Sequence, residues 1–166
     1  MPIAIQVGTP PQLTIGEPTE GNTYRAGDII SYTAHALDAA GFDMDDGDIK
    51  TEILLHHDTH VHPFLGPLTG RAGSFTIPDH GEAAANTWYE IRITVTDDSG
   101  LTDTKSVNIY PIKSQMTFDS NVPGLTFMLD GAPHTTPHTV QAVSYTHLTW
   151  WLVTDKNIQP VRSVSL

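Results

Sequence analysis

An alternation of apolar and mostly polar residues between Thr87 and Asp97 constrains the fold more than any other feature of this chain. Apolar side chains fall at every second position of this segment, at Tyr89, Ile91, Ile93 and Val95. Because successive side chains of a β-strand point to opposite faces, this period predicts a strand with one buried face. The turn sequence Asp97-Asp98-Ser99-Gly100 then predicts a hairpin and a return strand over 101–110.

Shorter segments repeat the same pattern along most of the chain. We predict strands at 13–16, 29–37, 49–57 and 74–77, with loops at 38–48 and 63–73. About seven short strands without a helix of ordinary length predict an all-β, immunoglobulin-like β-sandwich over 13–111. Its predicted core consists of Tyr32, Ile53, Tyr89, Ile91, Ile93 and Val107. Residues 1–12 contain three prolines and predict a linker or an edge strand.

A second, smaller β unit is expected after Pro111, because apolar segments and an Asp130-Gly131 turn follow it. We assign this partial unit to 112–143. Residues 144–166 have two interpretations. Ser144 to Thr149 resembles a translated sequencing-library adapter, which would make 144–166 a non-native tail, whereas the alternative is that 148–153 and 161–164 are strands that complete the second unit. We infer no function from this tail.

Composition limits the chemistry and the partners of this chain. It has no cysteine, so zinc–thiolate sites and thiol nucleophiles are excluded and any transition metal must bind to histidine or carboxylate. The formal charge of −11 opposes binding to nucleic acid or to anionic lipid. No apolar run is long enough to span a membrane, and the sequence starting Met1-Pro2-Ile3 lacks the pattern of a secretion signal, so an exported parent protein would carry its signal upstream.

The segment His56 to His62 contains four of the nine histidines of the chain. Imidazole is the commonest neutral metal ligand, and residues two apart on an extended backbone share a face, so His60 and His62 are candidate ligands of one ion. His56 and His57 point to opposite sides of a regular strand, and we favour His57 as the third ligand because it is nearer the predicted loop. The candidate ligand set for zinc or copper is His57, His60, His62, His56 and His80.

Four interpretations of the histidines remain open. The ion is structural and pins the loop to the sandwich, or it keeps an open position and activates water or oxygen, with Asp58 or Glu82 as the candidate base. In the third interpretation no ion binds, and imidazoles with Trp88 and Tyr89 form a sugar-binding surface. In the fourth, the histidines are separate loop residues. A calcium site is a further candidate, because Asp43, Asp45, Asp46 and Asp48 place oxygen ligands in one loop, although the spacing is not that of an EF-hand.

Residues 13–111 resemble the polycystic-kidney-disease-type (PKD-like) immunoglobulin modules of secreted bacterial sugar dehydrogenases and other carbohydrate-active proteins. The segments that carry the resemblance are Tyr24 to Asp28, Ala36 to Asp38, His56 to Pro63, Gly73 to Pro78, Asn86 to Ile91 and Val95 to Thr102. The resemblance implies a secreted or periplasmic accessory module beside a catalytic domain. It does not explain the histidine run, because ordinary modules of this class lack one. Taking the resemblance together with the histidine run, we expect a non-catalytic module with a metal-binding histidine loop that binds carbohydrate or polysaccharide, with Trp88 as a contact. The alternative is a small zinc- or copper-dependent enzyme, hydrolytic or oxidative, that acts on polysaccharide.

Overall fold

The structure, a computed structural model, is built almost entirely of β-strands. It describes residues 8–79, 86–121, 124–129, 131–144, 147–148, 150–154, 157–160 and 164–165. Within these ranges the helical structure is a single short turn, Asp46–Asp48, and no helix is long and apolar enough to cross a membrane. The chain divides into two compact units. Unit 1 contains Met1–Asn22, Ile29–Phe75 and Trp88–Tyr110, and unit 2 contains Thr23–Asp28, Thr76–Thr87 and Pro111–Leu166.

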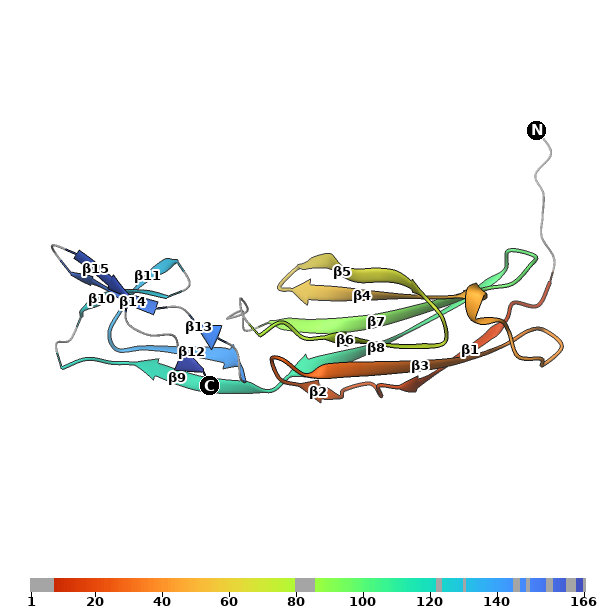
Figure 1. Ribbon diagram of the computed structural model, residues 1–166, viewed down its shortest axis with the longest axis horizontal. Helices are drawn as coiled ribbons and strands as arrows, with labels where there is room; N and C mark the ends of the chain where they lie inside the picture. The colour runs from red at the N-terminus through yellow and green to blue at the C-terminus, as the bar shows by residue number, and fades with distance from the viewer. Residues whose placement is uncertain are drawn as a thin grey trace, which may run out of the picture. The chain divides into compact units, whose positions relative to one another are not determined.

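Unit 1 is a β-sandwich, which confirms the predicted fold class (Figure 1). One sheet has the order β1-β3-β6 and the other the order β2-β8-β7-β4-β5. The strands of the first sheet are β1 (Gln12–Glu17), β3 (Ile29–Leu37) and β6 (Ala72–Thr76). The main strands of the second are β8 (Thr102–Pro111), β7 (Thr87–Thr96), β4 (Ile49–His57) and β5 (His60–Thr69). Its short first strand, β2 (Thr23–Tyr24), belongs to a segment that is counted with unit 2. This order of strands is that of an immunoglobulin-like sandwich.

The core of unit 1 contains the alternating residues that the sequence singled out. Ile91, Ile93 and Val95 of β7 are fully buried, whereas Arg92 and Thr94 between them are only partly buried. An aromatic cluster joins the two sheets: the ring of Phe64 lies 5.0 Å from that of Tyr89 and 6.0 Å from that of Phe75. Val107, a predicted core residue, is half-buried, and its neighbour Ile109 is the more deeply buried residue of β8.

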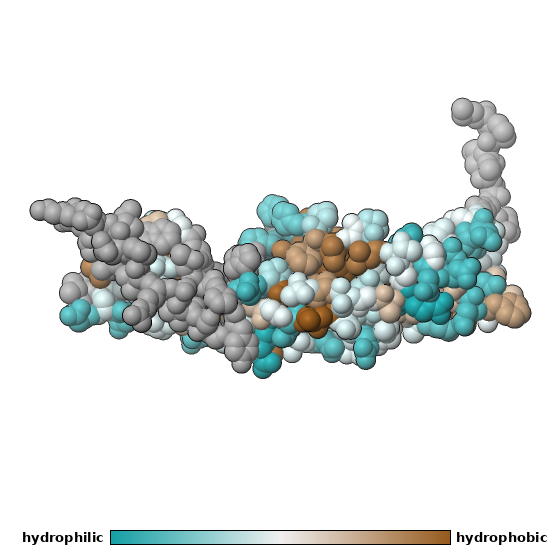
Figure 2. Space-filling view, viewed as in Figure 1, coloured by the Kyte–Doolittle hydropathy of each residue, from teal (hydrophilic) through white to brown (hydrophobic). Residues whose placement is uncertain are grey.

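The prediction of a loop at 63–73 was wrong, because β5 continues from His60 to Thr69. This strand contains Pro63, Gly66 and Pro67, which are residues that normally interrupt strands. It tolerates them because β5 lies at the edge of its sheet, where one row of backbone groups needs no partner. The predicted histidine-rich loop is therefore the end of a β4–β5 hairpin. Figure 2 shows hydrophobic surface over these strands, where Val61 and Leu65 are exposed.

Gly66 marks an irregular step in the β4–β5 pairing. The register shifts on either side of Ile53, so β5 uses extra residues opposite the same length of β4. Gly66 has a φ of 114°, and a Cβ atom added there would lie 2.6 Å from the backbone oxygen of Thr51. Only glycine combines this backbone conformation with such a close approach. The step brings the histidine-bearing ends of the two strands into the register described below.

Unit 2 has its own hydrophobic cluster. Phe118, Phe127, Leu129 and Ala142 are buried, and Met116, Val140 and Trp150 pack against them. The described strands are β9 (Lys113–Phe118), β10 (Thr126–Leu129), β11 (Ala132–Thr135), β12 (His138–Val143), β13 (His147–Leu148), β14 (Trp150–Thr154), β15 (Asn157–Pro160) and β16 (Val164–Ser165). Within 144–166, β14 pairs with β10, and the ring of Trp150 lies 5.8 Å from that of Phe118.

Candidate functional site

The histidine run forms the end of the β4–β5 hairpin. Asp58 and Thr59 make the turn, and Asp58 adopts a positive φ of 50°, a conformation that aspartate accepts more readily than most residues. In the pairing of the two strands, His57 lies opposite His60, His56 opposite Val61, and Leu55 opposite His62. Residues directly opposite each other on antiparallel strands project from the same face.

This register divides the four histidines between the two faces of the hairpin. His57, His60 and His62 share one face, which we call the triple-histidine face, while His56 and Val61 share the other. The alternation in the sequence predicted that His56 and His57 lie on opposite sides of the strand, and the pairing register places them on opposite sides. The two faces offer their imidazoles very different surroundings.

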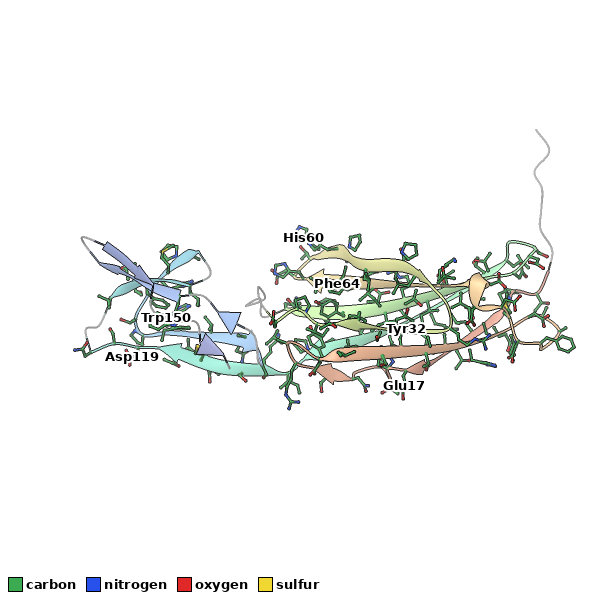
Figure 3. All side chains as sticks on the ribbon, in the orientation of Figure 1. Glu17, Tyr32, His60, Phe64, Asp119 and Trp150 are labelled. Atoms are coloured by element: carbon green, nitrogen blue, oxygen red, sulfur yellow. The ribbon has the colours of Figure 1, made fainter. Side chains whose placement is uncertain are left out.

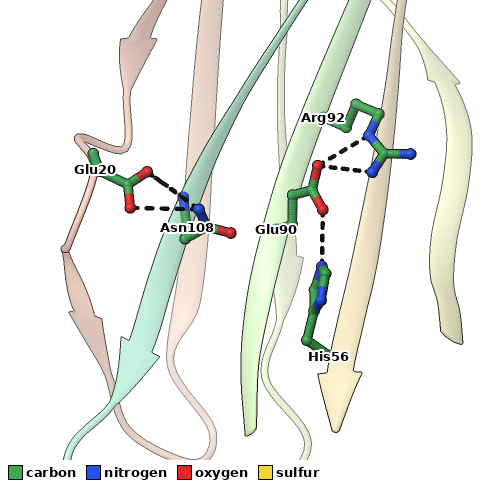
Figure 4. Close-up of polar contacts among 5 residues, drawn as sticks. All are labelled: Glu20, His56, Glu90, Arg92 and Asn108. Atoms are coloured by element: carbon green, nitrogen blue, oxygen red, sulfur yellow. Dashed lines mark hydrogen bonds and ion pairs between the residues drawn. The ribbon is translucent and has the colours of Figure 1, made fainter. Parts of the chain in front are cut away.

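On its face of the hairpin, His56 is held by residues of the neighbouring strand β7. Its Nε2 atom lies 2.8 Å from Oε2 of Glu90 (Figure 4). Its ring stacks on Trp88 with centroids 4.7 Å apart and planes inclined by 14°. Arg92 approaches the other carboxylate oxygen of Glu90, with Nε and Nη2 each 2.9 Å from Oε1. Only 18% of the His56 side chain is exposed, so this imidazole is fixed in place.

Glu90 is a buried carboxylate at the centre of this contact network, with 10% of its side chain exposed. Burial raises the pKa of Glu90, but hydrogen bonds from His56 and Arg92 and the positive charge of Arg92 lower it by more, so the pKa of Glu90 lies below its ordinary value near 4.5. The carboxylate is thus charged at neutral pH and orients both partners. Sequence reasoning missed Glu90 and Arg92 because they lie 34 and 36 positions beyond His56.

The triple-histidine face is open. His60 and His62 are exposed, their rings are nearly parallel at 19°, and their centroids lie 6.4 Å apart. The side chain of His57 is 36% exposed, and its Nε2 atom lies 3.9 Å from a carboxylate oxygen of Asp58. Figure 3 labels His60 at the end of the hairpin. The rings lie close together but do not meet at a point.

Accordingly, within the part of the chain that the structure describes, no three His, Asp or Glu side chains are already arranged to hold a metal ion. His56 is separated from the other candidate ligands by the hairpin itself and by its contact with Glu90. His80 and Glu82 lie outside the described residues. A ligand set of His57, His60 and His62 stays a prediction, and it requires that the exposed rings of His60 and His62 and the partly exposed ring of His57 turn about their side-chain bonds.

The face that carries His56 also bears other groups suited to a polar ligand. Trp88, a predicted sugar contact, is half-buried and lies on this face with Glu90 and Arg92. Glu90 pairs with Asn108 of β8, so Tyr110, two residues further along, projects from the same face, and it is 42% exposed. The alternation of side chains along β8 could have identified Tyr110 as a residue of this face from the sequence. We call Tyr110, Trp88, His56, Glu90 and Arg92 the aromatic platform.

The aspartate-rich loop at 38–48 uses its carboxylates within the protein. Asp43 lies 2.7 Å from Nε2 of His35, and Asp46 forms an ion pair with Arg71. Asp38 accepts backbone hydrogen bonds from Ala40 and Phe42, each of 2.8 Å. These contacts are those of a turn whose aspartates cap backbone groups.

Unit 2 contains a stacked pair of histidines. His134 lies in β11 and His138 begins β12, and their rings stack with centroids 4.1 Å apart. Phe127 of the hydrophobic cluster lies beside both, at 5.8 Å and 6.0 Å. Pro133 lies within β11 and Pro137 directly precedes β12, positions that would break a helix but that these short strands accept.

The chain was compared with protein families, curated proteins and solved structures. No protein-family profile, curated protein or solved structure matches the chain.

Proposed function

We propose that unit 1 is a non-catalytic, PKD-like accessory module that binds carbohydrate through the aromatic platform, as part of a secreted bacterial protein with a neighbouring catalytic domain. The single observation that carries this proposal is the fixed arrangement of Trp88, His56 and Glu90 on one sheet face. Pyranose rings stack their C–H groups on aromatic faces, and aromatic side chains with a polar end suit surfaces that are partly wet.

Fixed polar groups beside the rings support a sugar ligand more than an apolar one. Glu90 accepts hydrogen bonds through both oxygens, and the Arg92 side chain, which is 41% exposed, carries N–H donors beyond those that approach Glu90. Sugar hydroxyls both donate and accept hydrogen bonds, so a carboxylate and a guanidinium held side by side match them. Because His56 and Arg92 already orient Glu90, binding need not order this side chain, which lowers the entropic cost of association.

The test is retention of the protein on insoluble glycans, namely cellulose, chitin, xylan and starch, with released sugar measured in parallel. We expect wild-type protein to bind at least one of them and Trp88→Ala to weaken the binding by roughly tenfold, as expected for the loss of a buried aromatic contact at a binding surface. Tyr110→Ala, which removes an exposed ring, should weaken it without affecting folding. The matched control is Phe42→Ala, since Phe42 is a 71% exposed aromatic residue in the 38–48 loop.

The outcomes separate the two function classes. Failure of wild-type protein to bind any of these glycans, or equal binding by Trp88→Ala and Phe42→Ala, would contradict the platform. Release of soluble sugar by wild-type protein, stopped by chelator and restored by one metal, would instead support the metal-dependent enzyme that the sequence left open.

A further inference from the structure

We infer that the triple-histidine face binds one divalent transition-metal ion, with His60 and His62 as the primary ligands and His57 as the third. This site is independent of the aromatic platform, because the two lie on opposite faces of the hairpin. The inference depends on the pairing of β4 and β5, which places three imidazoles side by side on a two-stranded ribbon.

The spacing is close to what an ion requires. With Zn–N bonds of 2.0–2.1 Å, two imidazoles on one tetrahedral ion have ring centroids about 5 Å apart. The centroids of His60 and His62 are 6.4 Å apart. Closing this gap takes a rotation of side chains, which the exposure of both rings favours, and the contact between Nδ1 of His60 and Oγ1 of Thr59 is long, at 3.4 Å.

The third ligand comes from the opposite strand. His57 is the direct partner of His60, and residues in such pairs have Cβ atoms about 4.5–5.5 Å apart. Asp58, whose carboxylate lies 3.9 Å from the ring of His57, adds negative charge beside the site. The hairpin fixes the three backbone positions before any ion binds, so the ion orders only side chains.

The donor set indicates the kind of ion. Neutral imidazoles suit zinc and copper, whereas calcium and magnesium prefer oxygen ligands. Without thiolates, the order of affinities for divalent ions should follow the general trend in which copper binds more tightly than zinc. We therefore expect Cu²⁺ to bind more tightly than Zn²⁺, and Ca²⁺ not to bind on this face.

The experiment is a calorimetric titration of the full chain, prepared without a histidine tag, with Zn²⁺ and with Cu²⁺. We expect one ion per chain at the triple-histidine face and a loss of affinity of roughly tenfold or more in His60→Ala and His62→Ala, because each change removes a coordinate bond. His57→Ala should also weaken binding. His35→Ala is the matched control, since His35 is exposed and lies beside a carboxylate but on β3. In NMR spectra of the histidine side chains, zinc-induced changes in the chemical shifts of the imidazole nitrogens should be confined to His57, His60 and His62.

Three outcomes would contradict the inferred metal site. Wild-type protein that binds neither ion more tightly than free histidine has no such site. Unchanged binding by the His60→Ala/His62→Ala double variant, with its β-sheet circular dichroism intact, would place the ion elsewhere. Loss of binding in His134→Ala or His138→Ala, with none in His60→Ala or His62→Ala, would assign it to the stacked pair of unit 2. Glycan binding is a separate readout, so failure here leaves the aromatic platform untouched.

Discussion

Both faces of the β4–β5 hairpin end carry histidine, but the histidine on one face is packed and hydrogen-bonded while those on the other face are largely open to solvent. His56 is packed against Trp88 and bonded to the buried Glu90, whereas His60 and His62, a few residues away, are exposed. The difference arises from the position of β4 in the sheet. On the face of His56, the neighbouring strand β7 supplies Trp88 and Glu90, whereas on the other face, at the hairpin end, β5 supplies His60 and His62 beside His57.

The comparison shows that the identity of a residue does not decide its role in this segment. An imidazole that already has a carboxylate and an aromatic partner is a structural element of a binding face. An exposed imidazole with imidazole neighbours is available to a ligand. A cluster of histidines in the sequence therefore separates into two functions as soon as the strand register is known.

Removing Glu90 should have the largest effect on the His56 face. Glu90→Ala leaves the largely buried His56 and the partly exposed Arg92 without their shared acceptor, and such losses cost about 2–3 kcal/mol of unfolding free energy. Urea unfolding monitored by circular dichroism measures this change. Glu52→Ala, which removes an exposed carboxylate of β4, is the control and should change stability by less than about 0.5 kcal/mol. Equal stability of Glu90→Ala and wild type would mean that the contact network does not stabilise the sheet.

Truncating single histidines should give the direct contrast between the faces. His56→Ala removes a hydrogen bond to a carboxylate and an aromatic stack and should cost about 1–2 kcal/mol. His62→Ala removes an exposed ring, and in metal-free buffer it should cost less than about 0.5 kcal/mol. Both values come from the same unfolding experiment. If the two variants lost equal stability, the division of the hairpin into a packed face and an open face would be wrong.

The sequence predicted much of this arrangement and failed at identifiable points. The alternation in 29–37 and 49–57 predicted β3 and β4 with the bounds that the structure has. It missed β5 because Pro63, Gly66 and Pro67 are signals of a loop, and only the edge position of the strand makes them acceptable. A local pattern cannot give that position.

The partner of His56 was also beyond local reasoning. Glu90 contacts His56 only because β4 and β7 are neighbours in the sheet, and this neighbour relation is set by how the whole sandwich closes. Alternation within β4 predicted that His56 and His57 face opposite ways. It could not predict which of the two faces has partners.

Acid should reduce the stability of the His56 face through Glu90. The pKa of Glu90 is lower in the folded protein than its ordinary value near 4.5, so as pH falls the unfolded chain takes up this proton first. The stabilisation from Glu90 is therefore fully present above pH 4.5 and is lost as pH falls from there through the lowered pKa. Glu90→Gln cannot titrate at this position. The unfolding free energies of wild type and Glu90→Gln, measured from pH 6 down to pH 3, should therefore converge as the pH falls.

The loss of stability in acid should be smaller than the loss in Glu90→Ala, because protonation keeps the side chain and part of its hydrogen bonding. A constant difference between wild type and Glu90→Gln over this range would show that the carboxylate of Glu90 is not preferentially ionised in the folded state, and that His56 is held by its stack on Trp88 alone.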